Sequence, residues 1–392
     1  MAADATGRDM MMKDKNLKPG WRTWRFEQMA TNVNVRIENP SESGMEHYVG
    51  LEHLDPDSLR IRRWGSPDDV EAGKLFFKRG DIIFAKRRAY QRKLGVAEFD
   101  GICSAHAMVL RAKPEVVLPE FLPFFMQSDL FMNRAVAISV GSLSPTINWK
   151  TMAVQEFSLP PIDEQREFSS LFESAGNCID SLKQALDAVT MLQARMLIDH
   201  FEGTASKSKP LEDVLEKVID YRGKSPNKTL SGVPLITARN VRDGFLDFSQ
   251  TEYIPDNEFE SWMTRGMPQI GDILFTTEAP LGNVARVPAL RFALAQRLVC
   301  LRANENIMLS DYLYWTLRSP ITQQRVVQRS TGSTVSGVKQ SELRKVEVTV
   351  PSLEEQRTIA SQLNAVEQMG SILLSRLKAT TRMQKQLSAE LL

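Results

Sequence analysis

The residues best suited to chemistry lie in one basic segment. Residues 86–93 read Lys-Arg-Arg-Ala-Tyr-Gln-Arg-Lys, a dense run of cations with one aromatic ring and one amide. Arg and Lys pair with guanine O6 and N7 or with phosphate, and Gln pairs with adenine. A solvated charged surface is the alternative interpretation. The segment predicts nucleic-acid contact through Lys86, Arg87, Arg88, Tyr90, Gln91, Arg92 and Lys93.

The sequence contains partial matches to several catalytic motifs, and each match lacks an essential residue. Gly223-Lys224-Ser225 ends like a phosphate-binding loop, but Val218 occupies the position of its first glycine. The segment at 39–41 lacks the second proline of DNA amino-methyltransferases, and the carboxylates at 255–258 lack a lysine partner for a nuclease. Cysteines and histidines are too scattered for zinc or a disulfide framework. We therefore expect no catalytic, cofactor or metal site in this chain, and three buried or neutral thiols at Cys103, Cys178 and Cys300.

Length and composition predict an ordinary globular protein of two or three domains. The chain has 392 residues, 42% of them hydrophobic and 25% charged, with a formal net charge of +1. Because the total charge is so low, nucleic-acid binding must come from local patches. No apolar run reaches the length of a membrane span, and the first residues lack the apolar core of a secretory signal. A cytoplasmic protein without a membrane role is the expectation.

The chain is an internal repeat with an offset of 191 residues. Gly-Asp-Ile-[Ile/Leu]-Phe at 80–84 recurs at 271–275, Gly-Ser at 141–142 recurs at 332–333, and the segment at 159–166 recurs at 350–357. Arg111 with Arg302, and Gln193 with Gln384, keep the same offset. Chance matches would scatter in offset, so the chain contains two copies of one unit. In the first part of each unit the offset falls to 187, which marks insertions in surface loops.

The second copy offers different chemistry at matching loops. Glu278 follows the second Gly-Asp-Ile-Leu-Phe and suits cytosine N4, whereas His106 of the first copy aligns with Arg297. The same residues also have explanations that do not involve nucleic acid. His106 would be a hydrogen-bonded histidine of the interior, the charged residues would lie on a solvated surface, and the small polar residues would form turns. The remaining candidates lie in matching loops or follow a predicted strand, and they are Ser142, Ser144, Arg222, Lys224, Thr237, Arg239, Asn240, Thr277, Gln296, Ser333, Thr334 and Lys339.

Each copy consists of a globule and a long helix. Short β-branched runs with Gly and Pro between them predict α/β or α+β globules at 21–160 and 204–351, after a flexible stretch at 1–20. Apolar residues spaced four and three apart, without an internal proline, predict long helices at 161–203 and 352–392. Two helices in phase favour pairing as a coiled coil, although each alone also fits an ordinary amphipathic helix. The glutamine pair 193/384 interrupts the seam, either to fix register or through simple exposure.

The duplicated pattern resembles the specificity subunit of type I restriction–modification enzymes. The resemblance rests on the order and constant offset of Gly-Asp-Ile-[Ile/Leu]-Phe, the later Gly-Ser and the [Leu/Val]-Pro-x-[Ile/Leu]-[Asp/Glu]-Glu-Gln-Arg segment before a long helix. It implies two target-recognition domains joined by an antiparallel, pseudo-two-fold coiled coil, with no catalytic site. It also implies double-stranded DNA, two methyltransferase subunits and restriction subunits as partners. S-adenosylmethionine, ATP and Mg would belong to those partners.

The helix pair also predicts how a target would be organised. A helix of about 39 residues is roughly 58 Å long, so paired helices would act as a ruler between two readers. Unlike loops at matching positions then predict an asymmetric bipartite DNA site. Gln165, Arg166, Gln356 and Arg357, at the helix starts, either contact a partner or tie helix to globule. A coiled-coil adaptor with two ligand-binding globules, or a single-chain modification enzyme, are the alternative functions.

Overall fold

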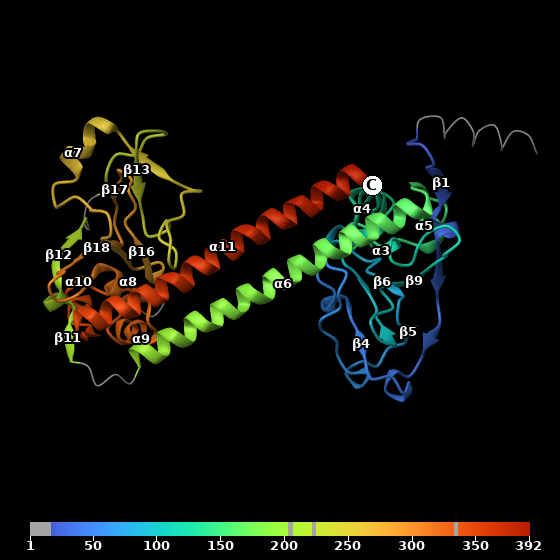
Figure 1. Ribbon diagram of the computed structural model, residues 1–392, viewed down its shortest axis with the longest axis horizontal. Helices are drawn as coiled ribbons and strands as arrows, with labels where there is room; N and C mark the ends of the chain where they lie inside the picture. The colour runs from blue at the N-terminus through green and yellow to red at the C-terminus, as the bar shows by residue number, and fades with distance from the viewer. Residues whose placement is uncertain (1–16, 203–206, 222–224, 333–335) are drawn as a thin grey trace, which may run out of the picture. The chain divides into compact units, whose positions relative to one another are not determined.

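The computed structural model describes residues 17–202, 207–221, 225–332 and 336–392 (Figure 1). These residues divide into two compact units. Among the described residues, unit 1 comprises 17–181 with 376–392, and unit 2 comprises those between 182 and 375. Each unit therefore contains one globule and part of both long helices.

The globule of unit 1 is built on two four-stranded sheets and a short two-stranded one. The strand orders are β2-β9-β6-β7, β3-β5-β8-β4 and β1-β10, and only β4 and β8 pair in parallel. Two apolar cores cover the sheets, one rich in phenylalanine around Phe131 and one around Phe77. The strands are β1 (Arg22–Arg25), β2 (Ala30–Val33), β3 (Arg36–Ile37), β4 (Tyr48–Val49), β5 (Lys74–Phe77), β6 (Ile82–Phe84), β7 (Leu94–Val96), β8 (Gly101–Cys103), β9 (Met108–Ala112) and β10 (Glu156–Leu159), and the short helices are α2 (Phe26–Met29), η5 (Ala89–Gln91), α3 (Leu122–Gln127), α4 (Asp129–Ala137) and α5 (Trp149–Ala153).

The globule of unit 2 repeats this plan. Its strand orders are β12-β18-β15-β16, β14-β13-β17 and β11-β19, and β13 and β17 form the parallel pair. One apolar core surrounds Trp315 and a second surrounds Leu235. The strands are β11 (Ser208–Pro210), β12 (Leu215–Asp220), β13 (Val233–Ile236), β14 (Glu252–Ile254), β15 (Ile273–Thr277), β16 (Leu281–Arg286), β17 (Ala293–Leu294), β18 (Leu298–Ala303) and β19 (Glu347–Thr349), and the helices are α7 (Phe259–Trp262), α8 (Ser310–Arg318), α9 (Pro320–Gln328) and α10 (Gln340–Leu343). The predicted duplication is confirmed, and mainly antiparallel sheets make each globule α+β.

The repeated Gly-Asp motif begins the central strand of each unit. Gly80 and Gly271 have φ of +89° and +88°, a conformation that favours glycine. The next aspartate is buried and binds an arginine from the neighbouring strand: Asp81 Oδ1 lies 2.7 Å from Arg111 Nε, and Asp272 Oδ1 lies 3.0 Å from Arg302 Nε. Each carboxylate also accepts a turn N–H at 2.8 Å. The motif is thus a structural device in both copies.

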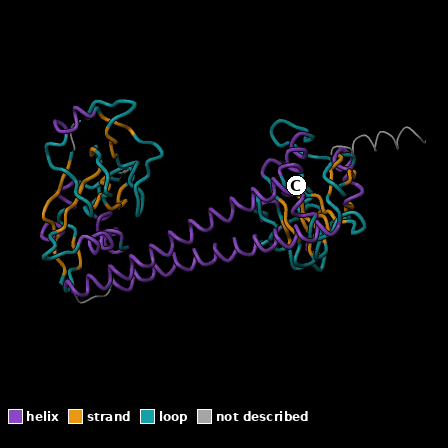
Figure 2. Tube along the Cα trace, turned by 45° about the horizontal axis from the view of Figure 1, so that its top comes forward, coloured by secondary structure: helices purple, strands orange, loops and turns teal. Residues whose placement is uncertain are grey.

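The two long helices are present and pair within each unit. They are α6 (Ile162–Phe201) and α11 (Leu353–Leu391). In unit 2, a Cβ placed on Gly370 of α11 would lie 3.5 Å from Val189 Cγ1 of α6, so the backbones approach closely there. In unit 1, Phe172 of α6 and Gln384 of α11 line one groove. Because each unit holds the beginning of one helix and the end of the other, the pair is antiparallel, as Figure 2 also shows.

A buried glutamine ties each long helix to its globule. Gln165 Oε1 accepts from the Leu118 N–H at 2.9 Å, and Gln356 Oε1 accepts from the Leu309 N–H at the same distance. The amide of Gln356 also donates to the carbonyls of Ile307 at 2.8 Å and Pro351 at 3.0 Å. Of the two roles considered for these glutamines, the geometry supports the tie between helix and globule.

Replacing Gln356 by alanine should therefore destabilise unit 2. The change leaves one N–H and two carbonyls without their buried partner, which we expect to lower the free energy of unfolding by about 2 kcal/mol. Gln324→Ala, at an exposed position of α9, is the matched control. Urea unfolding of the two variants measures the difference, and equal midpoints would contradict the role of the tie.

Candidate nucleic-acid interface

Three loops of unit 1 meet at one end of its central sheet. They are the basic loop 85–93 after β6, the turn 104–107 before β9, and the loop 139–147 after α4. The third loop closes on itself through two hydrogen bonds between Val140 and Thr146, at 3.0 and 2.9 Å. It joins the first through Arg88 N–H to Pro145 O at 2.7 Å and Ile147 N–H to Lys86 O at 3.0 Å. The sequence-distant candidates Lys86, Arg87, Arg88, His106, Ser142 and Ser144 are therefore brought onto one surface.

The side chains of this surface form a cationic cluster. Arg87 Nη1 lies 3.4 Å from His106 Nε2, and the Arg88 guanidinium donates to Ser144 Oγ at 3.1 and 3.2 Å. Partial burial, followed by the charges of Arg87 and Lys86, lowers the pKa of His106. Partial burial and the neighbouring Arg36 lower the pKa of Lys86. A site crowded with cations suits an anionic ligand, and the half-buried Arg87 and the exposed Arg88 can pair with phosphate or guanine.

Unit 2 repeats this backbone arrangement with other side chains. The Val338 N–H donates to Thr277 O at 2.9 Å, in the place of Ile147 and Lys86. Thr331 and Gly337 exchange two hydrogen bonds, at 2.8 and 3.0 Å, in the place of Val140 and Thr146. Each of these residues of unit 2 lies 191 positions after its counterpart in unit 1.

The matched positions carry unlike chemistry. Arg87 corresponds to Glu278 and His106 to Arg297, and the second pair is also in contact, with Arg297 Nε 4.0 Å from Glu278 Oε1. Both units thus place two side chains in contact at equivalent positions of the same loops. Unit 1 offers two donors or cations there, whereas unit 2 offers an acceptor beside a cation. Gln296 lies beside this pair in sequence and donates to Ser225 Oγ at 2.9 Å, while Lys339 is exposed at the start of α10.

The basic loop contains residues that the structure uses for itself. Arg92 lies 2.7 Å from Asp57 Oδ1 and 2.9 Å from Asp129 Oδ1, and Lys93 Nζ donates to Leu51 O at 2.9 Å. These contacts hold the loop to its neighbours and favour a supporting role for Arg92 and Lys93, and DNA contact by these two residues stays a prediction. Tyr90 is 54% exposed and Gln91 is half-buried in η5, so both remain candidates.

Replacing Arg92 by alanine should consequently affect stability more than binding. Its partners Asp57 and Asp129 are largely exposed, and such pairs contribute up to about 1 kcal/mol. We expect thermal unfolding to shift by a few degrees and DNA affinity to stay within about twofold of the wild type. A loss of affinity as large as that of an Arg87 variant would return Arg92 to the interface.

Two candidates of unit 2 are buried and need correction. Asn240 is 2% exposed, and its Oδ1 accepts from the Thr237 N–H at 2.9 Å and the Thr237 hydroxyl at 2.8 Å. Its amide donates to the carbonyls of Asp247 and Gln250. Thr277 is also 2% exposed. Asn240 therefore organises a turn with Thr237, and neither Asn240 nor Thr277 can reach a base from its place, whereas Arg239 is exposed beside them.

Four predicted contacts lie outside the described residues: Arg222, Lys224, Ser333 and Thr334. Sequence reasoning also missed a basic segment at 60–63. Arg60 Nε and Arg62 Nη2 lie 2.9 and 2.7 Å from Asp180 Oδ2 of α6, and Arg63 pairs with Asp55. The charge run itself is the signal in the sequence, and it has no equivalent in the second copy.

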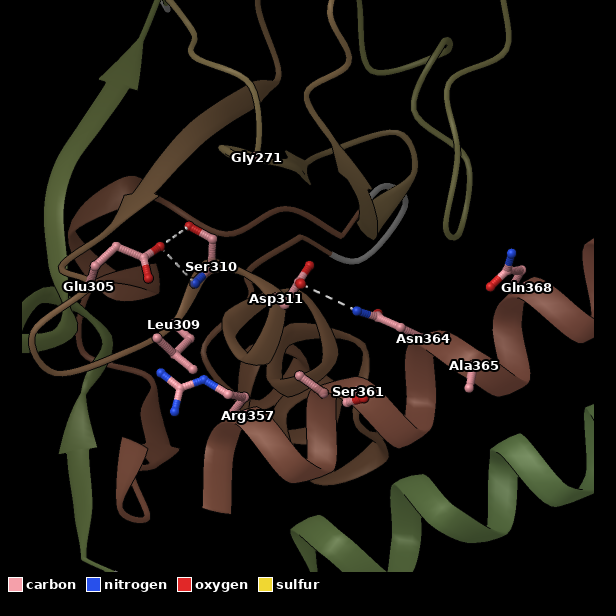
Figure 3. Close-up of a pocket in the computed structure, with 11 residues that line it drawn as sticks. Gly271, Glu305, Leu309, Ser310, Asp311, Arg357, Ser361, Asn364, Ala365 and Gln368 are labelled. Atoms are coloured by element: carbon pink, nitrogen blue, oxygen red, sulfur yellow. Dashed lines mark hydrogen bonds between the residues drawn. The ribbon is translucent and has the colours of Figure 1, made fainter. Parts of the chain in front are cut away.

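The helix starts carry exposed arginines and, in unit 2, a groove. Arg166 is exposed and lies 3.0 Å from Asp163 on the same helix. Arg357 lines a groove of about 680 Å³ against α8 (Figure 3). In it, Glu305 accepts from the Ser310 N–H at 3.0 Å and the Ser310 hydroxyl at 2.6 Å, and Asn364 donates to Asp311 at 3.2 Å. The contact between Asn364 and Asp311 joins α11 to α8, and the contacts of Glu305 with Ser310 lie at the start of α8.

The described residues give two further observations on chemistry. Among them, there is no group of three or more His, Cys, Asp or Glu side chains placed to hold a metal ion, and no helix long and apolar enough to cross a membrane. Burial raises the pKa of the Cys103 thiol to about 12 and that of Cys300 well above its usual value. Of the three thiols expected to be buried or neutral, Cys103 and Cys300 are buried and Cys178 is exposed.

Comparisons with known proteins agree on one family. The model of the type I restriction modification DNA specificity domain matches residues 70–191 and 205–380. The EcoDI specificity subunit of Escherichia coli is 28% identical over 196 residues, which cover 47% of this chain and 42% of that protein. The putative MjaX specificity subunit of Methanocaldococcus jannaschii is 20% identical over 81% of this chain and 80% of that protein.

Solved structures share the fold. The type I restriction–modification S subunit from M. genitalium has a TM-score of 0.64 at 14% identity, covering 96% of both chains. A chain from a study of complex assembly and conformational transition in a type I restriction–modification system has a TM-score of 0.58 at 21% identity, covering 96% of this chain and 98% of that one. The predicted fold of two globules and two paired helices is thereby confirmed.

Proposed function

Because this chain belongs to the type I restriction–modification DNA specificity family, we propose that it gives such a system its DNA sequence specificity. In this proposal the loop surfaces of the two units read the two parts of an asymmetric site in duplex DNA. The alternative of an adaptor without a DNA role finds no support in the family match.

One observation carries the proposal. Three backbone hydrogen bonds recur at matching positions of the loops in the two units, yet the units place Arg87 with His106 in one and Glu278 with Arg297 in the other. Sequence readout needs a constant loop backbone that carries variable side chains, because the backbone sets the position of the side chains and the side chains select the base. Unlike pairs at equivalent places predict unlike half-sites.

The proposal assigns the chemistry to partner subunits. Two methyltransferase subunits and the restriction subunits would bind this chain and supply S-adenosylmethionine, ATP and Mg sites, and this chain would act in the cytoplasm as a recognition subunit without a catalytic site. Apolar side chains exposed on the long helices support docking there, namely Met191, Leu192, Met369, Ile372, Leu374 and Met383. The partners would also add phosphate contacts that a chain of net charge +1 has in short supply.

Selection from random-sequence duplexes tests the proposal. The full chain is incubated with the duplex pool, alone and with the methyltransferase chains encoded with it, and the retained duplexes are sequenced. We expect enrichment of a two-part motif with an unread spacer. Retention without any sequence preference in both preparations would favour the adaptor.

A further inference from the structure

Leu143 stands almost fully in solvent at the tip of loop 139–147. Its side chain is 91% exposed, far more than the other apolar residues of the candidate surface, and Val140 of the same loop is 72% exposed. A leucine in water forgoes the favourable burial of its apolar surface. A single exposed leucine is unremarkable in a soluble protein, so its meaning depends on how the tip is held and on what surrounds it.

The tip is held in a fixed place. The two hydrogen bonds between Val140 and Thr146 close the base of the loop. Gly141 has a φ of +117°, which a residue with a side chain rarely adopts, so the turn itself is specified by sequence. The Arg88 backbone and guanidinium bind Pro145 and Ser144 on the far side of the tip. Leu143 is thus presented by a braced loop.

The surroundings of Leu143 are those of a phosphate-binding surface. Ser142 and Ser144 flank it with hydroxyls, and the cations Arg87 and Arg88 lie on the loop against which the tip is braced. Cations and hydroxyls favour the DNA backbone, and they disfavour an apolar protein partner at the same place. Within DNA, the apolar group that a leucine can contact on a base edge is the 5-methyl of thymine in the major groove.

We propose that Leu143 contacts the 5-methyl group of a thymine in the half-site read by unit 1. The proposal rests on the DNA-reading function and names one chemical group that this surface selects. Ser142, Ser144 and Arg88 hold the neighbouring backbone, and Leu143 excludes water from the methyl group. The matched position in the second copy holds a different residue, Thr334, and the proposal concerns unit 1.

Removal of single methyl groups from the target tests this contact. Each thymine of the selected site is replaced in turn by deoxyuridine, and the affinity of the full chain with its methyltransferase partners is measured for wild type and Leu143→Ser. We expect one deoxyuridine to weaken wild-type binding about fourfold, the effect of burying one methyl group. Leu143→Ser should bind the thymine and deoxyuridine duplexes equally.

The controls separate this proposal from the function on which it rests. Leu230 of unit 2 is 100% exposed, so Leu230→Ser makes the same substitution elsewhere and should keep the fourfold sensitivity. No sequence preference in the wild type would defeat the DNA-reading function itself. If the wild type does show a two-part preference, two results overturn the Leu143 contact alone. In the first, no deoxyuridine weakens wild-type binding. In the second, Leu143→Ser still binds the deoxyuridine duplex about fourfold more weakly than the thymine duplex, whether or not its affinity for both has fallen.

Discussion

Replacing Arg87 and Arg88 together by alanine is expected to abolish most recognition of one half-site, with a loss of affinity of about 100-fold. Arg87 presents its guanidinium beside His106, and Arg88 braces the loop that carries Ser144. A good bidentate pair to a base contributes about 1–3 kcal/mol of discrimination, and a lost phosphate contact lowers the salt dependence of binding. The half-site read by unit 2 should keep its sequence preference.

The control for this double variant lies at the other end of strand β6. Lys78 and Arg79 are adjacent exposed cations in the turn before the strand, so their replacement by alanine removes the same charge away from the loop surface. Affinities of both variants for the selected duplex, measured at several salt concentrations, separate a local contact from a general effect of charge. Unchanged affinity and specificity in the Arg87/Arg88 variant would remove this loop from the interface.

Replacing Asp272 by alanine is expected to produce the largest loss of stability, about 4 kcal/mol. Its carboxylate is 4% exposed and binds Arg302, whose side chain is 14% exposed. Removing one partner of a buried ion pair leaves the other charge without compensation, which typically costs 3–5 kcal/mol. The hydrogen bond from the Gln269 N–H at 2.8 Å is lost as well.

The first copy provides an internal comparison. Asp81 is equally buried, but the side chain of Arg111 is 50% exposed, so water can solvate the guanidinium that Asp81→Ala leaves behind. Asp81→Ala should therefore destabilise the protein less than Asp272→Ala, and Asp187→Ala, at an exposed position of α6, should have little effect. Urea unfolding gives the order. An Asp272→Ala variant as stable as Asp187→Ala would contradict the structural role of the motif.

The repeat made much of this fold predictable from sequence. A constant offset identified Gly80 with Gly271 and Arg111 with Arg302 before any contact was known, because matched residues must serve matched places. The 4-3 spacing of apolar residues likewise predicted α6 and α11. The pairing of strands within each globule could not be predicted, since short strands of two to six residues carry too little pattern to choose partners.

The candidate site was predictable as a set of loops and not as a set of contacts. Residue type pointed to the basic segment, but Arg92 and Arg87 look alike in sequence and differ only in their neighbours: Arg92 meets two carboxylates and Arg87 meets His106. Asn240 is likewise a residue type that pairs with adenine, but in the structure every donor and acceptor of its side-chain amide is already hydrogen-bonded within the protein. Long-range contacts decide such cases, and those contacts come only with the tertiary structure.

Methylome sequencing of cells with and without this protein tests the central claim most directly. If the chain gives a restriction–modification system its specificity, cells that carry it together with its methyltransferase partners should show methylated adenines within one two-part motif. That motif should have two different halves and disappear when the gene is deleted. Identical methylomes in the two strains, with the partner subunits expressed in both, would contradict the account.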